Sequence, residues 1–417
     1  MPPIATTCPA RPAPPSSRWV AFGAWLALAL QLAACGGGGS SAPKPASATQ
    51  AATVAQQLTP AAQLGELIFK DPTLSASGRM ACATCHDAQR GHASPFDTPV
   101  ALGGAGFDQA GLRNPPSLRY LRFNGAFHFE PDGTPMGGFF WDGRAATLQE
   151  QARGPFLNPL EMANPDAASV IAKLAAAPYA AQFRSVFGDA ILSQPDAAFD
   201  RMAFALQRYQ QEDPDFAPFT SKFDAVIAGG ATFTPQELNG LALFNRADKG
   251  NCAACHPSTK PANAPGALFT DFSYDNLGVP RNAAIAANAD AGFFDGGLCG
   301  ATRGDLVDRT DLCGAFKVPS LRNVALRRHF FHNGAFSSLE QVIRFYVRRD
   351  TDPQLWYPLD TLGNLVAYDD MPPALRGNVN TSEGPYNRRP GQAPALTDAE
   401  IDDLASFLRT LTDGYTP

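Results

Sequence analysis

Two Cys-x-x-Cys-His runs are the residues of this chain with the clearest chemistry. They are Cys82-Ala-Thr-Cys85-His86 and Cys252-Ala-Ala-Cys255-His256. In such a run, the two thiols form thioethers with the vinyl groups of one haem, and the adjoining histidine ligates its iron. A structural zinc clamp would need two more ligands near each cysteine pair, and disulfide redox chemistry would not need the histidine. The runs therefore predict a c-type cytochrome with two haem c groups.

The elements that must position these runs are repeated along the chain. Thr59-Pro60 and Thr234-Pro235 each predict a helix start ahead of a haem run, and Glu237 completes a capping box at the second. Two further segments recur: Pro116-Ser-Leu-Arg119 as Pro319-Ser-Leu-Arg322, and Asn124-Gly-Ala-Phe127 as Asn333-Gly-Ala-Phe336. A last capped amphipathic helix is expected from Thr397. We expect an all-α protein with two cytochrome c-like domains, residues 56–229 and 230–417, with few strands and long Gly/Pro-rich loops.

The first part of the chain is predicted to direct export. Arg11 and Arg18 precede the apolar run 19–32, and small residues then lead to Cys35, as in a bacterial lipobox. We expect residues 1–34 to be a lipoprotein signal peptide, Cys35 to carry the lipid, and residues 35–55 to be a flexible tether. An ordinary signal peptide with an incidental cysteine is the alternative. The protein is thus expected in the periplasm, attached only by lipid to a membrane, the outer one because Gly36 gives no inner-membrane retention signal.

The net charge and the cysteines indicate which classes of partner and which cellular compartment to expect. The formal net charge is −6 and the chain has no Lys/Arg cluster, so nucleic acid is not expected as a partner. Of the eight cysteines, Cys8 leaves with the signal, Cys35 takes lipid and four hold haem. Cys299 and Cys313 remain, and an oxidising compartment would let them form a disulfide, two free buried thiols being the alternative.

The two halves differ where a sixth iron ligand would lie. Aligning Asp142-Gly143 with Asn333-Gly334 without gaps puts Pro155 opposite Tyr346. If this position overlies the haem, haem 2 is ligated by His256 and Tyr346, while haem 1 has only His86 and is open to peroxide. Alternatively, Tyr346 is an ordinary residue of the hydrophobic core. Met371 is the alternative sixth ligand of haem 2.

The segment Phe140-Trp-Asp-Gly-Arg-Ala-Ala-Thr-Leu148, continued by Gln151-Ala152 and Leu160-Glu-Met162, resembles the bacterial dihaem cytochrome c peroxidase/MauG superfamily. The resemblance runs from about residue 57 to the C-terminus. It implies that Trp141 lies between the haems and that Pro155 lines the open haem. It also implies catalytic roles for Gln151, which would hold peroxide, and Glu161, which would shuttle its proton.

The resemblance also implies a calcium ion between the haems. Its ligands would be the side chain of Asn114 and two main-chain carbonyls. Those two positions hold Thr and Pro in the family pattern but Arg327 and His329 here, which weakens the expectation.

The second haem indicates a branch of the superfamily. Conventional peroxidases have methionine fourteen residues after the histidine of the His-x-Gly motif, whereas His332-Asn-Gly334 is followed at that spacing by Tyr346, as in MauG-type enzymes. The segment through Trp356 is similar to the MauG-like MbnH branch. His332 is expected to bond a haem propionate. His92, which would be a haem 1 ligand only in a reductively activated enzyme, is expected to be a solvated loop residue.

These features predict an enzyme that reacts with hydrogen peroxide at haem 1. Haem 2 would share the oxidising equivalents through Trp141, and an aromatic residue of a periplasmic partner protein, a tryptophan in the MbnH-like case, would be oxidised. One alternative is a conventional peroxidase that draws electrons from a small cytochrome. Another is a dihaem electron carrier without catalysis.

Overall fold

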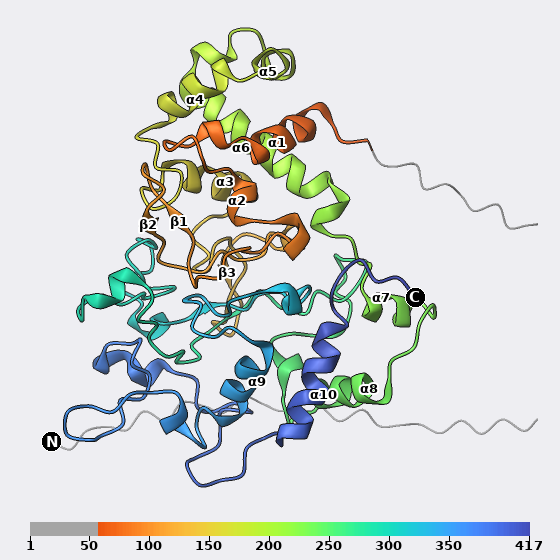
Figure 1. Cartoon of the computed structure of the whole chain (residues 1–417), viewed down its shortest axis with the longest axis vertical. Coiled ribbons are helices and arrows are strands. Elements are labelled where there is room, and N and C mark those ends of the chain that lie inside the picture. Colours follow the sequence, from red (N-terminus) through yellow and green to blue (C-terminus); the bar gives the residue numbers. More distant parts are fainter. Residues whose placement is uncertain (1–56) are drawn as a thin grey trace, which may run out of the picture. The chain divides into compact units, whose positions relative to one another are not determined.

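Each half of the chain is built around a crossing of two helices. The computed structural model describes residues 57–417, so the predicted signal peptide, Cys35 and the whole predicted tether lie outside the described residues. In the first half α1 (Pro60–Lys70) packs on α6 (Pro195–Glu212), and in the second α8 (Pro235–Asn245) packs on α10 (Asp398–Arg409) (Figure 1). Gly65 and Gly240 lie at the two crossings. A Cβ on either would come within 2.1 Å of a carbonyl oxygen of the facing helix, so only glycine lets the helices approach so closely.

Local side-chain caps start these helices where the sequence predicts. The Thr59 hydroxyl accepts from the amide of Ala62, and Pro60 takes the first helical position. Thr234 with Glu237 and Thr397 with Glu400 each form a reciprocal capping box. These predicted helix starts are therefore confirmed.

The remaining regular structure is short. The other helices of residues 57–417 are α2 (Cys82–Cys85), α3 (Leu148–Leu157), α4 (Ala167–Ala176), α5 (Ala180–Phe187), α7 (Lys222–Ile227) and α9 (Leu339–Arg348), with several 3-10 turns between them. The strands form two-residue antiparallel pairs: β1 (Leu102–Gly103) with β2 (Gln109–Ala110), β3 (His128–Phe129) with β4 (Pro135–Met136), and β5 (Tyr274–Asp275) with β6 (Phe316–Lys317). The helix-dominated fold with few strands and long loops is as predicted.

Two main hydrophobic cores lie one in each half. One gathers buried side chains between Leu64 and Phe216, and the other gathers those between Phe223 and Leu411. Phe223 of α7 packs on Phe269 and Phe407 in the second core. The two-domain organisation and its boundary at residues 229 and 230 stay a prediction, and Phe223, which this boundary assigns to the first domain, lies in the second core.

The halves are joined by polar contacts at the C-terminal end. Asp413 accepts hydrogen bonds from the hydroxyl of Tyr120 at 2.8 Å and from the amide of Asn323 at 2.6 Å. It also pairs with Arg119. A carboxylate that follows α10 thus holds residues of both halves.

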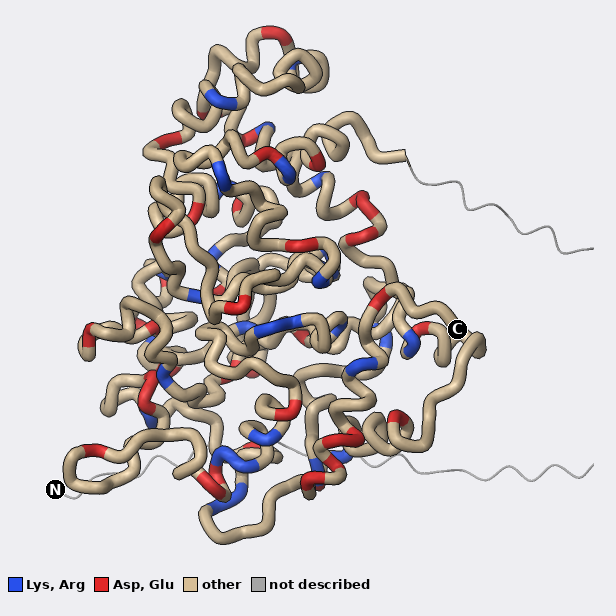
Figure 2. Tube along the Cα trace, in the orientation of Figure 1, with Lys and Arg blue, Asp and Glu red and all other residues tan. Residues whose placement is uncertain are grey.

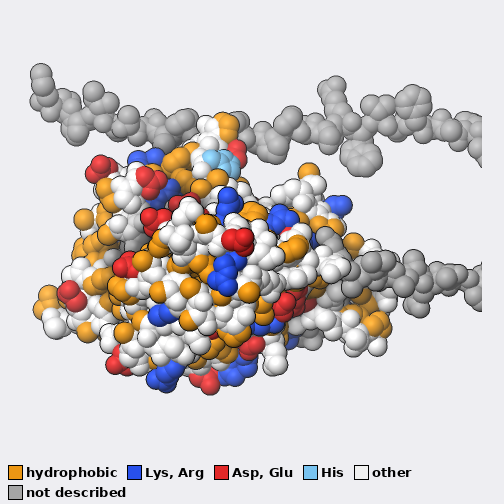
Figure 3. All heavy atoms as spheres, turned by 90° about the horizontal axis from the view of Figure 1, so that it is seen from above, with side chains coloured by type: hydrophobic (Ala, Val, Ile, Leu, Met, Phe, Trp, Pro, Cys, Tyr) orange, Lys and Arg blue, Asp and Glu red, His pale blue; other side chains and the backbone are white. Residues whose placement is uncertain are grey.

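Charges of both signs are interspersed along the described trace (Figure 2), and one face of the molecule mixes them with hydrophobic side chains (Figure 3). Within residues 57–417, no helix is both long and apolar enough to cross a bilayer.

Candidate active site

The two haem-attachment runs are held in the same way in both halves. The imidazole Nδ1 of His86 lies 3.2 Å from the carbonyl oxygen of His92, and Nδ1 of His256 lies 2.9 Å from that of Phe269. A carbonyl can only accept, so each Nδ1 carries the proton, and each Nε2 keeps a lone pair. Both histidines are thus set to ligate iron.

The chemistry of these side chains fits haem c. Burial raises the pKa of all four haem-run thiols to about 12 and lowers the pKa of His86 to about 4, and burial also lowers the pKa of His256. Both imidazoles are therefore neutral near pH 7, as metal ligation requires. Within residues 57–417 no three His, Cys, Asp or Glu side chains gather into a metal cluster, which excludes the zinc clamp.

Each run opens on its own cavity. The cavity at Cys82, Cys85 and His86 measures about 590 Å³, and the one at Cys252, Cys255 and His256 measures about 170 Å³. The two cavities are lined largely by different side chains.

The predicted peroxide-handling residues line the larger cavity together. Thr147 caps α3, and on this helix Gln151 and Pro155 follow each other at a spacing of one turn. The side-chain amide of Gln151 has no hydrogen-bond partner among residues 57–417. Glu161, just beyond the helix, accepts a 2.6 Å hydrogen bond from Asn158. Burial raises the pKa of Glu161, although the Asn158 bond and the Arg144 charge oppose the shift. This wall thus offers a hydrogen-bonding amide beside a carboxyl with an elevated pKa.

Trp141 lies between the two cavities and contributes to both walls. Its indole N–H donates to the carbonyl of Asn114 at 2.8 Å, and its own carbonyl accepts from the amide of Lys317 at 2.9 Å. The next residue, Asp142, is fully buried and accepts from Arg113 at 2.7 Å and from Arg144 at 2.9 Å. Burial alone would raise the pKa of Asp142, but these two arginines hold it below its usual range. Hydrogen bonds with Asn114 and Lys317 therefore hold Trp141 in place.

Tyr346 lines the smaller cavity from α9. Its ring lies 5.8 Å from that of Phe331 and 6.0 Å from that of Tyr386. The hydroxyl has no hydrogen-bond partner in the described part of the chain, and burial raises its pKa. A buried phenol usually finds such a partner, so this one is available to a ligand in the cavity. Met371 lines the same cavity, with its sulfur packed against Gly314.

The interpretation of His92 as a solvated loop residue is wrong. Its side chain is 2% exposed, its Nε2 lies 2.7 Å from a carboxylate oxygen of Asp215, and its ring stacks on Phe216 at 4.1 Å. Because Asp215 holds Nε2 and the ring does not line the haem 1 cavity, the side chain is not placed to ligate iron. Instead, the main-chain carbonyl of His92 holds His86.

The other histidines have three different environments. His332 is buried in the wall of the smaller cavity, stacked on Phe316 at 3.5 Å. Its role toward a propionate remains a prediction. His128 is exposed beside Glu130, and His329 is partly buried, with Nδ1 at 3.3 Å from the carbonyl of Gly334.

The residues at the expected calcium site do not fit that ion. Asn114 donates through Nδ2 to the carbonyls of His329 at 2.9 Å and Phe331 at 3.2 Å. The Arg327 guanidinium donates to the carbonyl of His329 at 3.4 Å and to that of Pro115 at 3.2 Å. Of the three expected ligand oxygens, the carbonyl of His329 already accepts from Asn114 and from the Arg327 guanidinium, whose positive charge would repel a calcium ion. The structure therefore does not support the expected calcium ion, and no local sequence pattern indicates that the Arg327 side chain turns toward these carbonyls.

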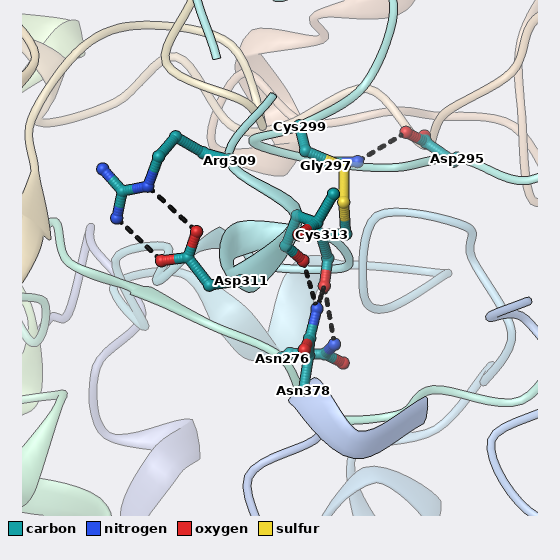
Figure 4. The surroundings of a disulfide bond; sticks show 9 residues. Asn276, Asp295, Gly297, Cys299, Arg309, Asp311, Cys313 and Asn378 are labelled. Atoms are coloured by element: carbon teal, nitrogen blue, oxygen red, sulfur yellow. Dashed lines mark hydrogen bonds and ion pairs between the residues drawn. A yellow bond between two sulfur atoms is a disulfide. The ribbon is translucent and has the colours of Figure 1, made fainter. Parts of the chain in front are cut away.

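Cys299 and Cys313 form the expected disulfide, which closes a loop of the second half (Figure 4). This loop reaches the first half, because the Thr302 hydroxyl donates to Asp142 at 2.9 Å. Just before the loop, Asp295 accepts two hydrogen bonds from Arg113. Sequence reasoning did not find these contacts with the segment around Trp141.

Comparisons with known proteins agree with this arrangement. The family model for di-haem cytochrome c peroxidase matches residues 59–232. The methylamine utilization protein MauG of Paracoccus denitrificans is 38% identical over 373 residues, which span 87% of this chain and 92% of that protein. The crystal structure of the diheme peroxidase BthA from Burkholderia thailandensis superposes with a TM-score of 0.80 at 43% identity, covering 86% of this chain and 87% of that one.

A MauG-like protein associated with microbial copper homeostasis shares the fold, with a TM-score of 0.59 at 24% identity over 86% of this chain and 91% of that one. This likeness supports the fold alone, so the narrower placement in the MbnH branch stays a prediction. At the level of the superfamily the similarity covers most of the chain. The chain thus belongs to the dihaem cytochrome c peroxidase/MauG superfamily of haem-dependent oxidoreductases, which implies two haem c groups.

Proposed function

We propose that this protein uses hydrogen peroxide to oxidise an aromatic side chain, a tryptophan in the MbnH-like case, of a periplasmic partner protein. The observation that carries the proposal is the asymmetry of the cavities: Tyr346 presents an unpartnered hydroxyl to the His256 cavity, whereas Gln151 and Glu161 face the larger His86 cavity. Bound haem iron supplies a site for peroxide where a coordination position is open and a store for oxidising equivalents where it is closed.

Gln151 and Glu161 would handle the peroxide. The unpartnered amide of Gln151 donates a hydrogen bond to bound peroxide. The carboxylate of Glu161 accepts the proton of one peroxide oxygen and returns it to the other as the O–O bond breaks. Two electrons from the partner and two protons then complete the reduction of hydrogen peroxide to two waters.

Trp141 and Tyr346 would govern the electrons. Trp141 borders both cavities and is fixed by hydrogen bonds, which suits it to carry electrons between them. A phenolate oxygen from Tyr346 donates charge and favours oxidised iron, so the second site holds an oxidising equivalent until the partner supplies an electron. The partner would be oxidised at a distance, by electron transfer across the protein surface.

The cellular setting belongs to the same proposal. We infer a lipid anchor at Cys35 on the outer membrane, a tether over residues 35–55, and an enzyme body of two modules in the periplasm, residues 56–229 and 230–417. The Cys299–Cys313 disulfide supports an oxidising compartment.

Spectra of the resting holoprotein test the proposal. We expect one high-spin and one low-spin ferric haem, and reaction with peroxide without prior reduction. Trp141→Phe should keep the peroxide reaction but slow oxidation of the second haem. Two low-spin haems that ignore peroxide would support the electron carrier, and activity only after partial reduction would support the conventional peroxidase.

A further inference from the structure

A partly buried arginine lies where the family pattern would place a calcium ion. Arg327 lines both haem cavities, and in residues 57–417 it forms no ion pair with a carboxylate. Its guanidinium donates only to the main-chain carbonyls of His329 and Pro115. Burial lowers the pKa of Arg327 to about 10, which still leaves it charged near pH 7.

Two acidic side chains of this region already pair with other arginines. Asp295 also lines both cavities, but Arg113 binds it at 2.6 Å through Nε and at 2.7 Å through Nη2. Asp142 accepts from Arg113 and Arg144. A cation that is partly shielded from water and forms no ion pair within residues 57–417 is costly, so the site favours an added anion.

Haem c brings such anions, since each carries two propionates. A guanidinium matches a carboxylate as a planar two-pronged donor. A residue that borders both cavities can reach a propionate of either haem. A calcium ion near the carbonyl of His329 would instead lie beside the Arg327 charge, and in a buried site the repulsion would be strong.

We propose that the guanidinium of Arg327 replaces calcium as the fixed cation between the two haems and binds their propionates. This inference does not depend on the partner or on the target residue proposed above. It assigns Arg327 a positioning role, and it predicts a dihaem enzyme that keeps its sites without calcium.

Metal analysis and chelation of the holoprotein test whether the protein keeps its haem sites without calcium. We expect the purified protein to contain no stoichiometric calcium. Treatment with EGTA, or addition of calcium chloride, should leave its optical and spin-resonance spectra unchanged. One bound calcium ion per chain, or loss of the resting spectrum on chelation, would overturn the inference.

Redox titration of Arg327→Gln tests whether the Arg327 charge acts on the two haems. Removing a fixed positive charge favours the ferric state, so the reduction equilibrium constant of each haem should fall by about tenfold, or about 59 mV. Arg327→Lys keeps the charge and should retain most of the wild-type potential, which provides a second measurement if the glutamine variant does not fold. The matched control is Arg328→Gln, because Arg328 pairs with Asp97 at the surface and should leave both potentials unchanged. Wild-type potentials in Arg327→Gln, or an equal shift in the Arg328 control, would contradict the role.

Discussion

The backbone that holds the iron-ligating histidine is nearly the same in the two haem sites, whereas the residues that α3 and α9 contribute to the two cavities differ. His92 and Phe269 both have positive φ angles, 54° and 53°, and the carbonyl of each accepts from the iron-ligating histidine of its half. The same carbonyls also accept from the amides of Leu118 and Leu321, which follow the repeated Pro-Ser segments. Duplication has therefore preserved the backbone that orients the histidine.

The opposite walls show where the two halves have diverged. In the first half α3 contributes Gln151 and Pro155, and Pro155 offers neither a ligand atom nor an N–H. In the second half α9 contributes Tyr346, whose oxygen can bind iron. The same fold can thus provide a site that reacts with peroxide, with Pro155 on the helix, and a site that holds an oxidising equivalent, with Tyr346 on the helix. Predictions that exchange or remove these residues test this comparison.

The largest effect is expected from Glu161→Gln, which removes the proton carrier and retains nearly the same shape. The rate of peroxide reaction should fall by about 10²- to 10⁴-fold, measured by rapid mixing. Burial raises the pKa of Glu161, and its carboxylate form is the base. The wild-type rate should therefore fall as pH is lowered through a pKa above that of an ordinary glutamate, and this acid limb should be absent in the variant.

Glu66→Gln is the matched control for this carboxyl. Glu66 lies on the surface of α1, in a 2.7 Å pair with Lys70, and its change should leave the rate and its pH dependence as in the wild type. An acid limb that persists in Glu161→Gln would assign the proton transfer to a different group.

Tyr346→Met should have the next largest effect, because it gives the second haem the ligand of a conventional peroxidase. A thioether favours ferrous iron more than a phenolate does, so the potential of haem 2 should rise by roughly 0.1 V or more. Spectroelectrochemical titration measures this change, and haem 1 should keep its potential. Tyr386→Phe is the control, since its ring lies 6.0 Å from that of Tyr346 in the same wall. An unchanged haem 2 in Tyr346→Met would favour Met371 as the ligand.

Features encoded within a few residues could be predicted from the sequence, and features set by distant contacts could not. The helix starts at Thr59, Thr234 and Thr397 follow from cap and proline residues that are local. Burial of His92 depends on Asp215, 123 residues away, and the direction of the Arg327 side chain depends on Pro115, 212 residues away. No local pattern contains such information.

Trp141 is an intermediate case. Trp141 and His332 directly precede the aligned Asp142 and Asn333, but only the family resemblance implies that Trp141 lies between the haems. The structure now shows this indole in both cavity walls. Its electron-transfer role still requires the measurement on Trp141→Phe.

The smallest effect is expected from His92→Phe, which makes the first half resemble the second. Phe269 shows that a phenyl side chain is compatible with this backbone conformation, and the site already contains Phe69 and Phe216. The carbonyl that holds His86 belongs to the main chain and is retained. Asp215 loses the imidazole but keeps Arg119. We therefore expect an unchanged haem 1 spectrum and a loss of about 1 kcal/mol in the free energy of unfolding, measured by urea denaturation.

The reverse exchange, Phe269→His, completes the comparison. Phe269 is packed among Phe223, Phe244 and Phe407, with ring separations of 4.9 to 6.2 Å. A histidine there would lie in an aromatic core without the carboxylate that Asp215 provides in the first half, so the loss should be about 3 kcal/mol or more. If His92→Phe were the more damaging of the two, or altered the spin state of haem 1, the imidazole of His92 would control haem 1 directly. The duplicated backbone alone would then not explain how the first histidine is held.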